Sequence, residues 1–260
     1  MIEKRIFIPC DNHDIPMVLT YPDNEGVFPC MLLLHGFMSY KEGDGYLFKK
    51  TADKFAEEGI ASARIDFCSM GENRYSRVHY GTEICLKEAK TAFEYLQTDQ
   101  HIIHDRIGIL GHSMGGRIAF LSASLSSKCL ISFNGAINVY ESLSIKMKGL
   151  DVKEIETQGY TIYHTSDGRS ELLFPKFVED TKICSDDIFK YTNPILLCVG
   201  ANDPTLDPNV SYNFAKKWKK DNLDMIVIDD ANHTFNAKTG DYTKVYELLS
   251  KVIPWLKKNL

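Results

Sequence analysis

The chain has 260 residues, enough for one large domain or two small ones, and its 44% hydrophobic and 25% charged residues are typical of a globular protein. The formal net charge of -5 at pH 7 argues against a nucleic-acid partner, because such proteins usually carry an excess of Lys and Arg. The longest apolar runs are too short for a membrane-spanning helix, so we expect no membrane span.

The amino terminus and the cysteines bear on location and metal binding. Charges lie within the first residues and no long apolar stretch follows them, so we expect no secretory signal and a cytoplasmic location. Seven cysteines without a C-x-x-C pair predict neither a disulfide framework nor a zinc site. Cys30, Cys129 and Cys198 lie in or beside apolar runs and are interpreted as small buried hydrophobes.

The predicted elements begin with an antiparallel hairpin, since two apolar runs over 5–8 and 15–20 flank a polar stretch over 10–14. Strand-like runs then alternate with helix-length segments, which indicates a parallel sheet with helices on both faces. These runs span 31–34, 61–67, 106–110, 130–133, 195–199 and 225–228.

Helix signals lie between several of these runs. A helix over 47–58 ends before Gly59, a typical C-cap residue. Residues 82–96 place apolar side chains at helical spacing. The last helix, at about 242–256, contains Pro254 and requires a local kink there.

The alternation breaks once, over about 137–191, where an ordinary crossover would need far fewer residues. This surplus indicates an insertion. Within it, 160–163 and 171–174 flank Asp167-Gly168, a plausible turn for a small hairpin. No interdomain linker is visible, so we expect one domain over residues 1–260 that carries this insertion.

A G-x-S-x-G pattern at 111–115 lies between a short apolar strand and a helix-forming segment, the context that a nucleophilic serine requires. The pattern predicts that the Ser113 hydroxyl projects from a sharp turn. A serine hydroxyl is a poor nucleophile at neutral pH and needs a base, which in turn needs a group that fixes its tautomer. The alternative is a Gly-rich strand-to-helix turn in which the serine has no catalytic role.

The base and its partner follow two later strands. Asp203 comes directly after the run 195–199, and His233 comes after the run 225–228. Carboxyl ends of parallel strands converge on one crevice, and the order Ser, Asp, His is that of the α/β hydrolases. The sequence therefore predicts Ser113 as nucleophile, His233 as general base and Asp203 as the residue that orients it, with Asp207, Asp229 and Asp230 as competing acids.

An oxyanion hole is expected beside the serine, because acyl transfer passes through a tetrahedral oxyanion. The run 31–34 is followed by His35-Gly36, which is typical of the first oxyanion loop. The predicted donors are the backbone N–H groups of Phe37 and Met114. We interpret His35 and His112 as structural side chains that pack beside the turn.

These motifs together resemble the α/β-hydrolase superfamily and, within it, the bacterial cinnamoyl (feruloyl) esterases. The resemblance implies a mostly parallel eight-stranded sheet with helices on both faces and a small lid formed by the insertion at about 137–191. One departure is Cys68-Ser69-Met70-Gly71, where the family usually has a G-x-G-x-S type turn. The lid would contribute aromatic substrate contacts, for which Tyr140, Tyr160 and Tyr163 are candidates, although such aromatics can also pack a lid's own core.

The function expected from this pattern is hydrolysis of a small-molecule carboxylic ester, through an acyl-enzyme and without a cofactor or metal. Hydroxycinnamoyl or other small aryl and acyl esters are the expected substrates. The alternatives are a monoacylglycerol lipase, a thioesterase or an acyl-peptide hydrolase, since the lid rather than the triad selects the substrate. A ligand sensor that retains a hydrolase fold is an alternative of another class, and the sequence leaves the oligomeric state open.

Overall fold

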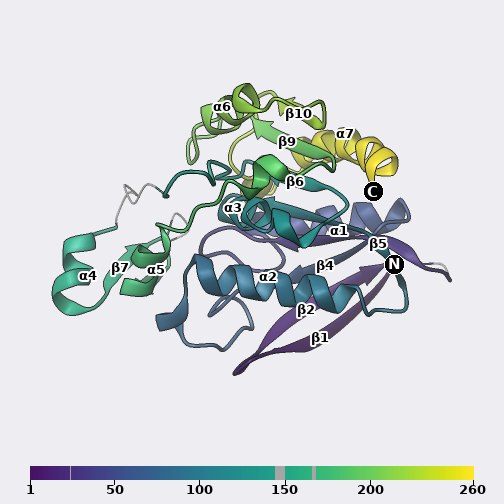
Figure 1. The fold of residues 1–260 in the computed structure, drawn as a ribbon. Helices are drawn as coiled ribbons and strands as arrows, with labels where there is room; N and C mark the ends of the chain where they lie inside the picture. Colours follow the sequence, from purple (N-terminus) through teal and green to yellow (C-terminus); the bar gives the residue numbers. More distant parts are fainter. Residues whose placement is uncertain (24, 144–149, 166–167) are drawn as a thin grey trace.

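The computed structural model describes residues 1–23, 25–143, 150–165 and 168–260. An eight-stranded sheet with the order β1-β2-β4-β3-β5-β6-β9-β10 forms its centre (Figure 1). The strands of this sheet are β1 (Ile2–Cys10), β2 (His13–Tyr21), β3 (Phe28–Leu34), β4 (Ala61–Ile65), β5 (Ile102–His112), β6 (Leu130–Phe133), β9 (Ile195–Gly200) and β10 (Leu223–Ile228). The helices are α1 (Leu47–Glu57), α2 (Thr82–Leu96), α3 (Met114–Leu121), α4 (Val152–Gln158), α5 (Pro175–Asp180), α6 (Asn209–Lys217) and α7 (Thr243–Asn259).

The sheet is mostly parallel, as predicted. β1 pairs with β2 and β2 pairs with β4 in antiparallel register, and the remaining neighbours are parallel. The expected opening hairpin is confirmed, and its two strands are joined through Asp11, which has a positive φ of 48°. β5 begins four residues before the predicted run. The first residues of the strand include the exposed polar residues His104 and Asp105, which give no apolar signal.

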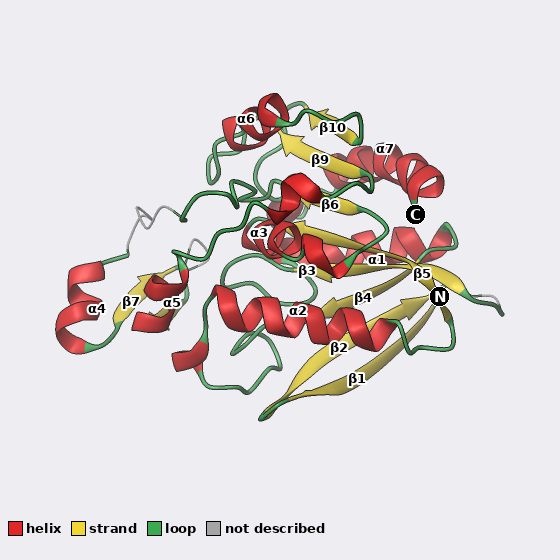
Figure 2. Cartoon of the chain, in the orientation of Figure 1, coloured by secondary structure: helices red, strands yellow, loops and turns green. Residues whose placement is uncertain are grey.

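Helices cover both faces of the sheet, as Figure 2 shows. Alternate side chains of β3 enter different cores, since neighbouring residues of a strand point to opposite faces. Leu32 and Leu34 pack with the core under α2, α3 and α6, whereas Met31 and Leu33 pack with the core under α1 and α7. The predicted helix over 82–96 is confirmed with the same bounds, and α7 continues through Pro254 to Asn259.

The segment between β6 and β9 carries α4, α5 and a separate hairpin of β7 (Thr161–His164) and β8 (Ser170–Leu173), as predicted. The expected turn residue Asp167 lies outside the described residues, and Gly168 has a positive φ of 85°. Figure 1 shows α4, β7 and α5 extending beyond the main sheet on the side where β9 and β10 end. This segment can therefore contact loops at the carboxyl ends of the strands.

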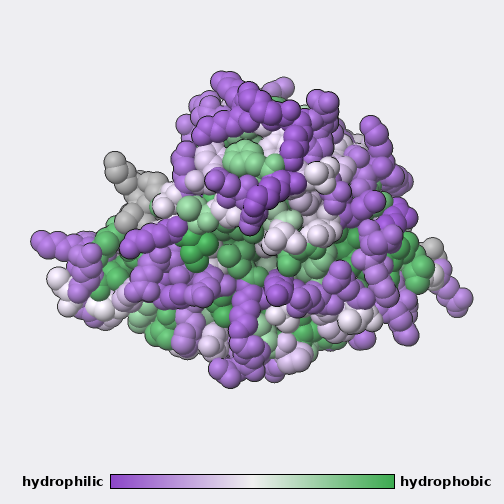
Figure 3. Space-filling model, viewed as in Figure 1, coloured by the Kyte–Doolittle hydropathy of each residue, from purple (hydrophilic) through white to green (hydrophobic). Residues whose placement is uncertain are grey.

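The described helices include none that is long and apolar enough to cross a bilayer. In the view of Figure 3, hydrophilic residues cover most of the surface and apolar patches interrupt them near the middle. Cys30, Cys129 and Cys198 are buried and free, which agrees with their interpretation as core residues.

Candidate active site

Ser113 lies in the sharp turn between β5 and α3. Its φ of 56° and ψ of -120° belong to a backbone region that non-glycine residues rarely adopt, so the surrounding structure must hold it there. Gly115 makes the turn possible, because a Cβ at this position would lie 1.9 Å from the Leu34 carbonyl oxygen. The strand-to-helix turn predicted from the G-x-S-x-G pattern is thus present.

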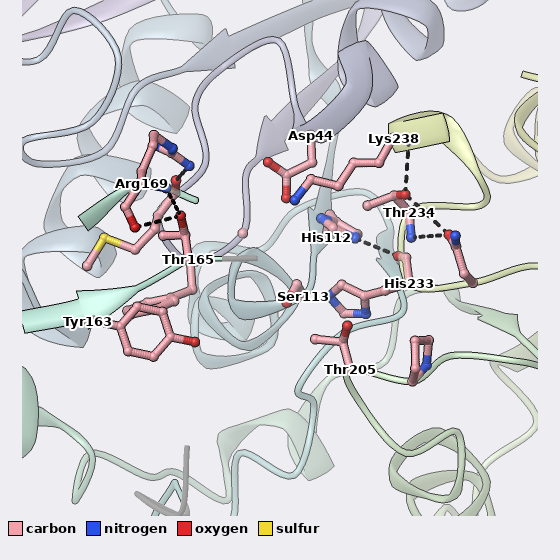
Figure 4. Close-up of a pocket in the computed structure, with 15 residues that line it drawn as sticks. Asp44, His112, Ser113, Tyr163, Thr165, Arg169, Thr205, His233, Thr234 and Lys238 are labelled. Carbon is pink, nitrogen blue, oxygen red and sulfur yellow. Dashed lines mark hydrogen bonds between the residues drawn. The ribbon is translucent and has the colours of Figure 1, made fainter. Parts of the chain in front are cut away.

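The side chain of Ser113 lines a pocket of about 310 Å³ at the carboxyl ends of the strands. Figure 4 shows Ser113 between two walls of this pocket. Tyr163, Thr165 and Arg169 from the β7–β8 hairpin form one wall. The other wall combines the loops after β3, β9 and β10, which contribute Asp44, Thr205, His233, Thr234 and Lys238.

His233 and Asp203 are joined by a hydrogen bond of 2.6 Å between Nδ1 and Oδ2. The second oxygen of Asp203, Oδ1, accepts the backbone N–H groups of Thr205 and Leu206 at 2.8 and 3.0 Å. These bonds fix the carboxylate, and a carboxylate acceptor places the imidazole proton on Nδ1. Nε2 is then the basic nitrogen, and Figure 4 shows the imidazole directed towards Ser113.

Two side chains hold the loop that carries His233. Asn134, directly after β6, donates to the His233 carbonyl at 3.0 Å and accepts the Gly200 N–H at 2.7 Å. His112 contacts the same His233 carbonyl through Nε2 at 2.8 Å. Asn134 was not among the predicted site residues, although its position directly after an apolar strand was the available signal.

Burial and, after it, the neighbouring His233 lower the pKa of His112 to about 4. The unfolded chain would bind this proton near pH 6.5, so between about pH 6.5 and pH 4 only the unfolded state is protonated there. The free energy of unfolding should therefore fall by roughly 3 kcal/mol as the pH falls through this window.

Urea unfolding across this pH range tests the expectation, with His112→Gln as the comparison. The variant should lose less stability on acidification than the wild type. Some dependence should remain, because burial also lowers the pKa of His35. Equal pH dependence in the two proteins would contradict the assignment.

The expected oxyanion donors lie on either side of Ser113. Met114 is the first residue of α3, where the helix leaves its backbone N–H groups without helical partners. Phe37 lines the pocket from the loop after β3, and Gly36 brings this loop close, since a Cβ there would lie 3.1 Å from the Ser113 Cβ. His35 fixes the loop by contacting the Gly36 carbonyl and accepting the Phe67 N–H at 3.0 Å.

Of the three tyrosines proposed as substrate contacts, the structure brings only Tyr163 to the pocket lining. Tyr160 precedes β7 on the same face as the exposed Ile162, whereas Tyr163 shares the inner face with the buried Thr161, as strand alternation requires. Tyr140 instead packs against Phe189 and Phe214 of the core. The lining of this pocket thus includes Tyr163 and neither Tyr140 nor Tyr160.

Several polar pocket residues were not predicted, because they come from loops without a periodic pattern. Gly45 packs against the backbone of Ala237 and Lys238, and this contact brings Asp44 and Lys238 to the same side of the pocket.

Over residues 1–23, 25–143, 150–165 and 168–260, no group of three or more His, Cys, Asp or Glu side chains is arranged to hold a metal ion.

Comparison with known families agrees with this geometry. Residues 55–260 match the prolyl oligopeptidase family. The chain belongs to this family. It is a serine hydrolase of the α/β-hydrolase fold, as the sequence predicted.

Two curated relatives carry names of hydrolases. One is 2,6-dihydropseudooxynicotine hydrolase of Paenarthrobacter nicotinovorans, which is 28% identical over 135 residues. The match covers 51% of this chain and 35% of the relative, so it spans about a third of that protein. A probable 2-oxo-3-(5-oxofuran-2-ylidene)propanoate lactonase of a Bradyrhizobium species is 25% identical over 239 residues, 86% of this chain and 79% of the relative.

Solved structures show the same fold. Est1E from Butyrivibrio proteoclasticus, solved with ferulic acid bound, has a TM-score of 0.82 and 21% identity, with 98% of each chain covered. The α/β hydrolase GrgF from a Penicillium species has a TM-score of 0.80 and 12% identity, with 100% of this chain and 99% of that chain covered. The expected resemblance to feruloyl esterases is thus confirmed at the level of the fold.

Proposed function

We propose that this hydrolase cleaves small carboxylic esters through an acyl-enzyme on Ser113, with His233 as general base and Asp203 as the group that orients it. The observation that carries the proposal is the 2.6 Å bond between His233 and Asp203 beside a serine held at positive φ in one pocket. This combination supplies both a base of defined tautomer and a projecting hydroxyl.

The proposed reaction has two halves. Ser113 Oγ bonds to the ester carbonyl carbon while its proton passes to His233 Nε2, and the N–H groups of Phe37 and Met114 bind the resulting oxyanion. The tetrahedral intermediate collapses, the C–O bond to the alcohol breaks, and the imidazolium protonates the departing oxygen. Water then attacks the acyl-enzyme with His233 as base, which releases the acid and restores the serine.

We also propose that residues 1–260 act as one domain, in which the insertion at about 137–191 covers the site as a lid. The contribution of Tyr163, Thr165 and Arg169 to the pocket wall supports this role. An insertion that lines the pocket would contribute to the selection of substrates.

For the substrate we propose hydroxycinnamoyl or other small aryl and acyl esters. A pocket of about 310 Å³ is at the small end of ligand sites. Phe37 and Tyr163 provide aromatic surface within it, and the ferulic acid bound to Est1E supports an aryl ligand in this fold. Acyl-peptide hydrolysis is the second candidate, because the chain belongs to the prolyl oligopeptidase family.

A substrate panel tests the proposal. It compares methyl hydroxycinnamates, acylglycerols, acyl thioesters and acyl-peptide amides, and steady turnover of p-nitrophenyl acetate separates an enzyme from a ligand sensor. We expect fluorophosphonate labelling of the wild type at Ser113 and the highest kcat/KM on the aryl esters. A higher kcat/KM on acyl-peptide amides or acylglycerols would overturn the substrate class, and an unlabelled wild type would overturn the mechanism.

A further inference from the structure

We infer that Glu171 is a positioning residue that links the β7–β8 hairpin to the oxyanion loop and so fixes the Phe37 N–H. This inference rests on the proposed function, which uses that N–H as an oxyanion donor. Glu171 lies outside the triad, and its role would be to affect the rate of the chemical step.

Glu171 bridges two guanidinium groups. Its Oε2 accepts from Arg77 Nη2 at 2.8 Å, and its Oε1 lies 3.4 Å from Arg169 Nη1. All three side chains contribute to one network, and Glu171 supplies the negative charge shared by the two arginines. Without it, the two guanidinium groups, which both contact Met38, would repel each other.

Both arginines hold Met38, the residue that follows Phe37. Arg169 donates to the Met38 carbonyl at 2.7 Å, and Arg77 contacts the Met38 sulfur at 2.8 Å. Met38 has a positive φ of 55°, a strained conformation for a non-glycine residue that persists only when neighbours fix it. The bond between Arg169 and the Met38 carbonyl acts on the backbone of this turn directly.

Arg77 connects the network to the main body of the protein. Its Nε donates to Ser69 Oγ at 3.0 Å, and its Nη2 donates to the Ser69 carbonyl at 3.2 Å. Glu171 therefore ties the hairpin to a side chain that is already anchored outside the insertion. The salt bridge sets where the hairpin sits relative to the oxyanion loop.

The aromatic contacts of Phe37 depend on the same placement. Its ring packs edge-on against Tyr163 of β7 and at a 45° tilt against Phe177 of α5, with ring centroids 5.2 Å apart in both pairs. Polar contacts thus act on the backbone after Phe37 while aromatic contacts act on its ring. Because Gly36 lies so close to Ser113, a displacement of this loop changes the distance from the Phe37 N–H to the reacting carbonyl.

The test measures steady-state kinetics of Glu171→Ala on p-nitrophenyl acetate, an ester too small to need the hairpin for binding. We expect kcat to fall at least about tenfold, with KM within about twofold of wild type. Loss of a whole oxyanion donor lowers kcat by about 10²–10³-fold, so the expected effect is smaller than that. Glu171→Gln should recover part of kcat, because its amide oxygen can still accept from Arg77. Glu179→Ala, an exposed acid of the same insertion, serves as the control and should match the wild type.

Arg169→Lys is a second variant for the case in which Glu171→Ala fails to fold. A lysine keeps the charge but cannot reproduce the forked contact with both the Met38 carbonyl and Glu171, so the same fall in kcat is expected. An unchanged kcat in a folded variant, or a raised KM with wild-type kcat, would overturn the inference. A wild type that is neither labelled at Ser113 nor active would instead overturn the proposed function.

Discussion

Replacement of Ser113 with alanine should lower kcat on p-nitrophenyl acetate on the order of 10⁶-fold, the size of effect that loss of a triad nucleophile has in a serine hydrolase. The reason is that no other hydroxyl occupies the turn from which the β5–α3 junction projects this side chain. Fluorophosphonate labelling should disappear in the same variant. The measurement is turnover of p-nitrophenyl acetate by the purified variant and wild type.

The matched comparison uses the variant of the base and the double variant. His233→Ala should lower kcat by a similar factor, and the double variant should be no worse than either single one, because the nucleophile and its base act as a unit. Urea unfolding checks that Ser113→Ala remains folded. A variant that keeps more than about a hundredth of wild-type kcat while folded would show that the reaction uses another nucleophile.

The centre of the sheet could be predicted from the sequence because most of its strands are buried apolar runs. A buried parallel strand such as 195–199 is a nearly continuous apolar run bounded by turn residues, and few other structures produce that pattern. The predicted start of β5 is too late, because the exposed residues His104 and Asp105 lie where the register with β3 shifts and give no apolar signal.

The triad candidates could be identified for a related reason. Ser113, Asp203 and His233 each follow the carboxyl end of a strand, so the sheet topology alone brings them to one edge. The opposite wall of the pocket could not be found this way. Arg169 and Thr165 reach the pocket because a hairpin far from the sheet packs back onto the loop after β3, a contact between two irregular segments.

The tyrosine candidates show the limit of composition as a guide. Tyr160 and Tyr163 are equally aromatic and only three residues apart, yet one is exposed and the other faces the pocket. Their faces depend on where β7 begins, and a one-residue change of register would exchange them. For Tyr140, the deciding factor is the aromatic cluster with Phe189 and Phe214, which belongs to tertiary packing.

Replacement of Asp203 with asparagine should lower kcat about 10⁴-fold while leaving the fold intact, the effect expected when a triad histidine is held in the wrong tautomer. Oδ1 of Asp203 accepts two backbone N–H groups, so an asparagine must keep its oxygen at that position. Its NH₂ group would then occupy the place of Oδ2 and donate to His233 Nδ1. The imidazole proton would move to Nε2, and this nitrogen could then no longer accept the proton of Ser113.

Asp207→Asn is the matched control for this experiment, because it makes the same change in the same loop. Asp207 is exposed and accepts from the Asn209 backbone and side chain through Oδ1, a role that an asparagine oxygen can keep. Its kcat should equal that of the wild type. If Asp207→Asn were the inactive variant and Asp203→Asn retained full activity, the acid that orients His233 during the reaction would be Asp207, and the bond between His233 and Asp203 would have no catalytic role.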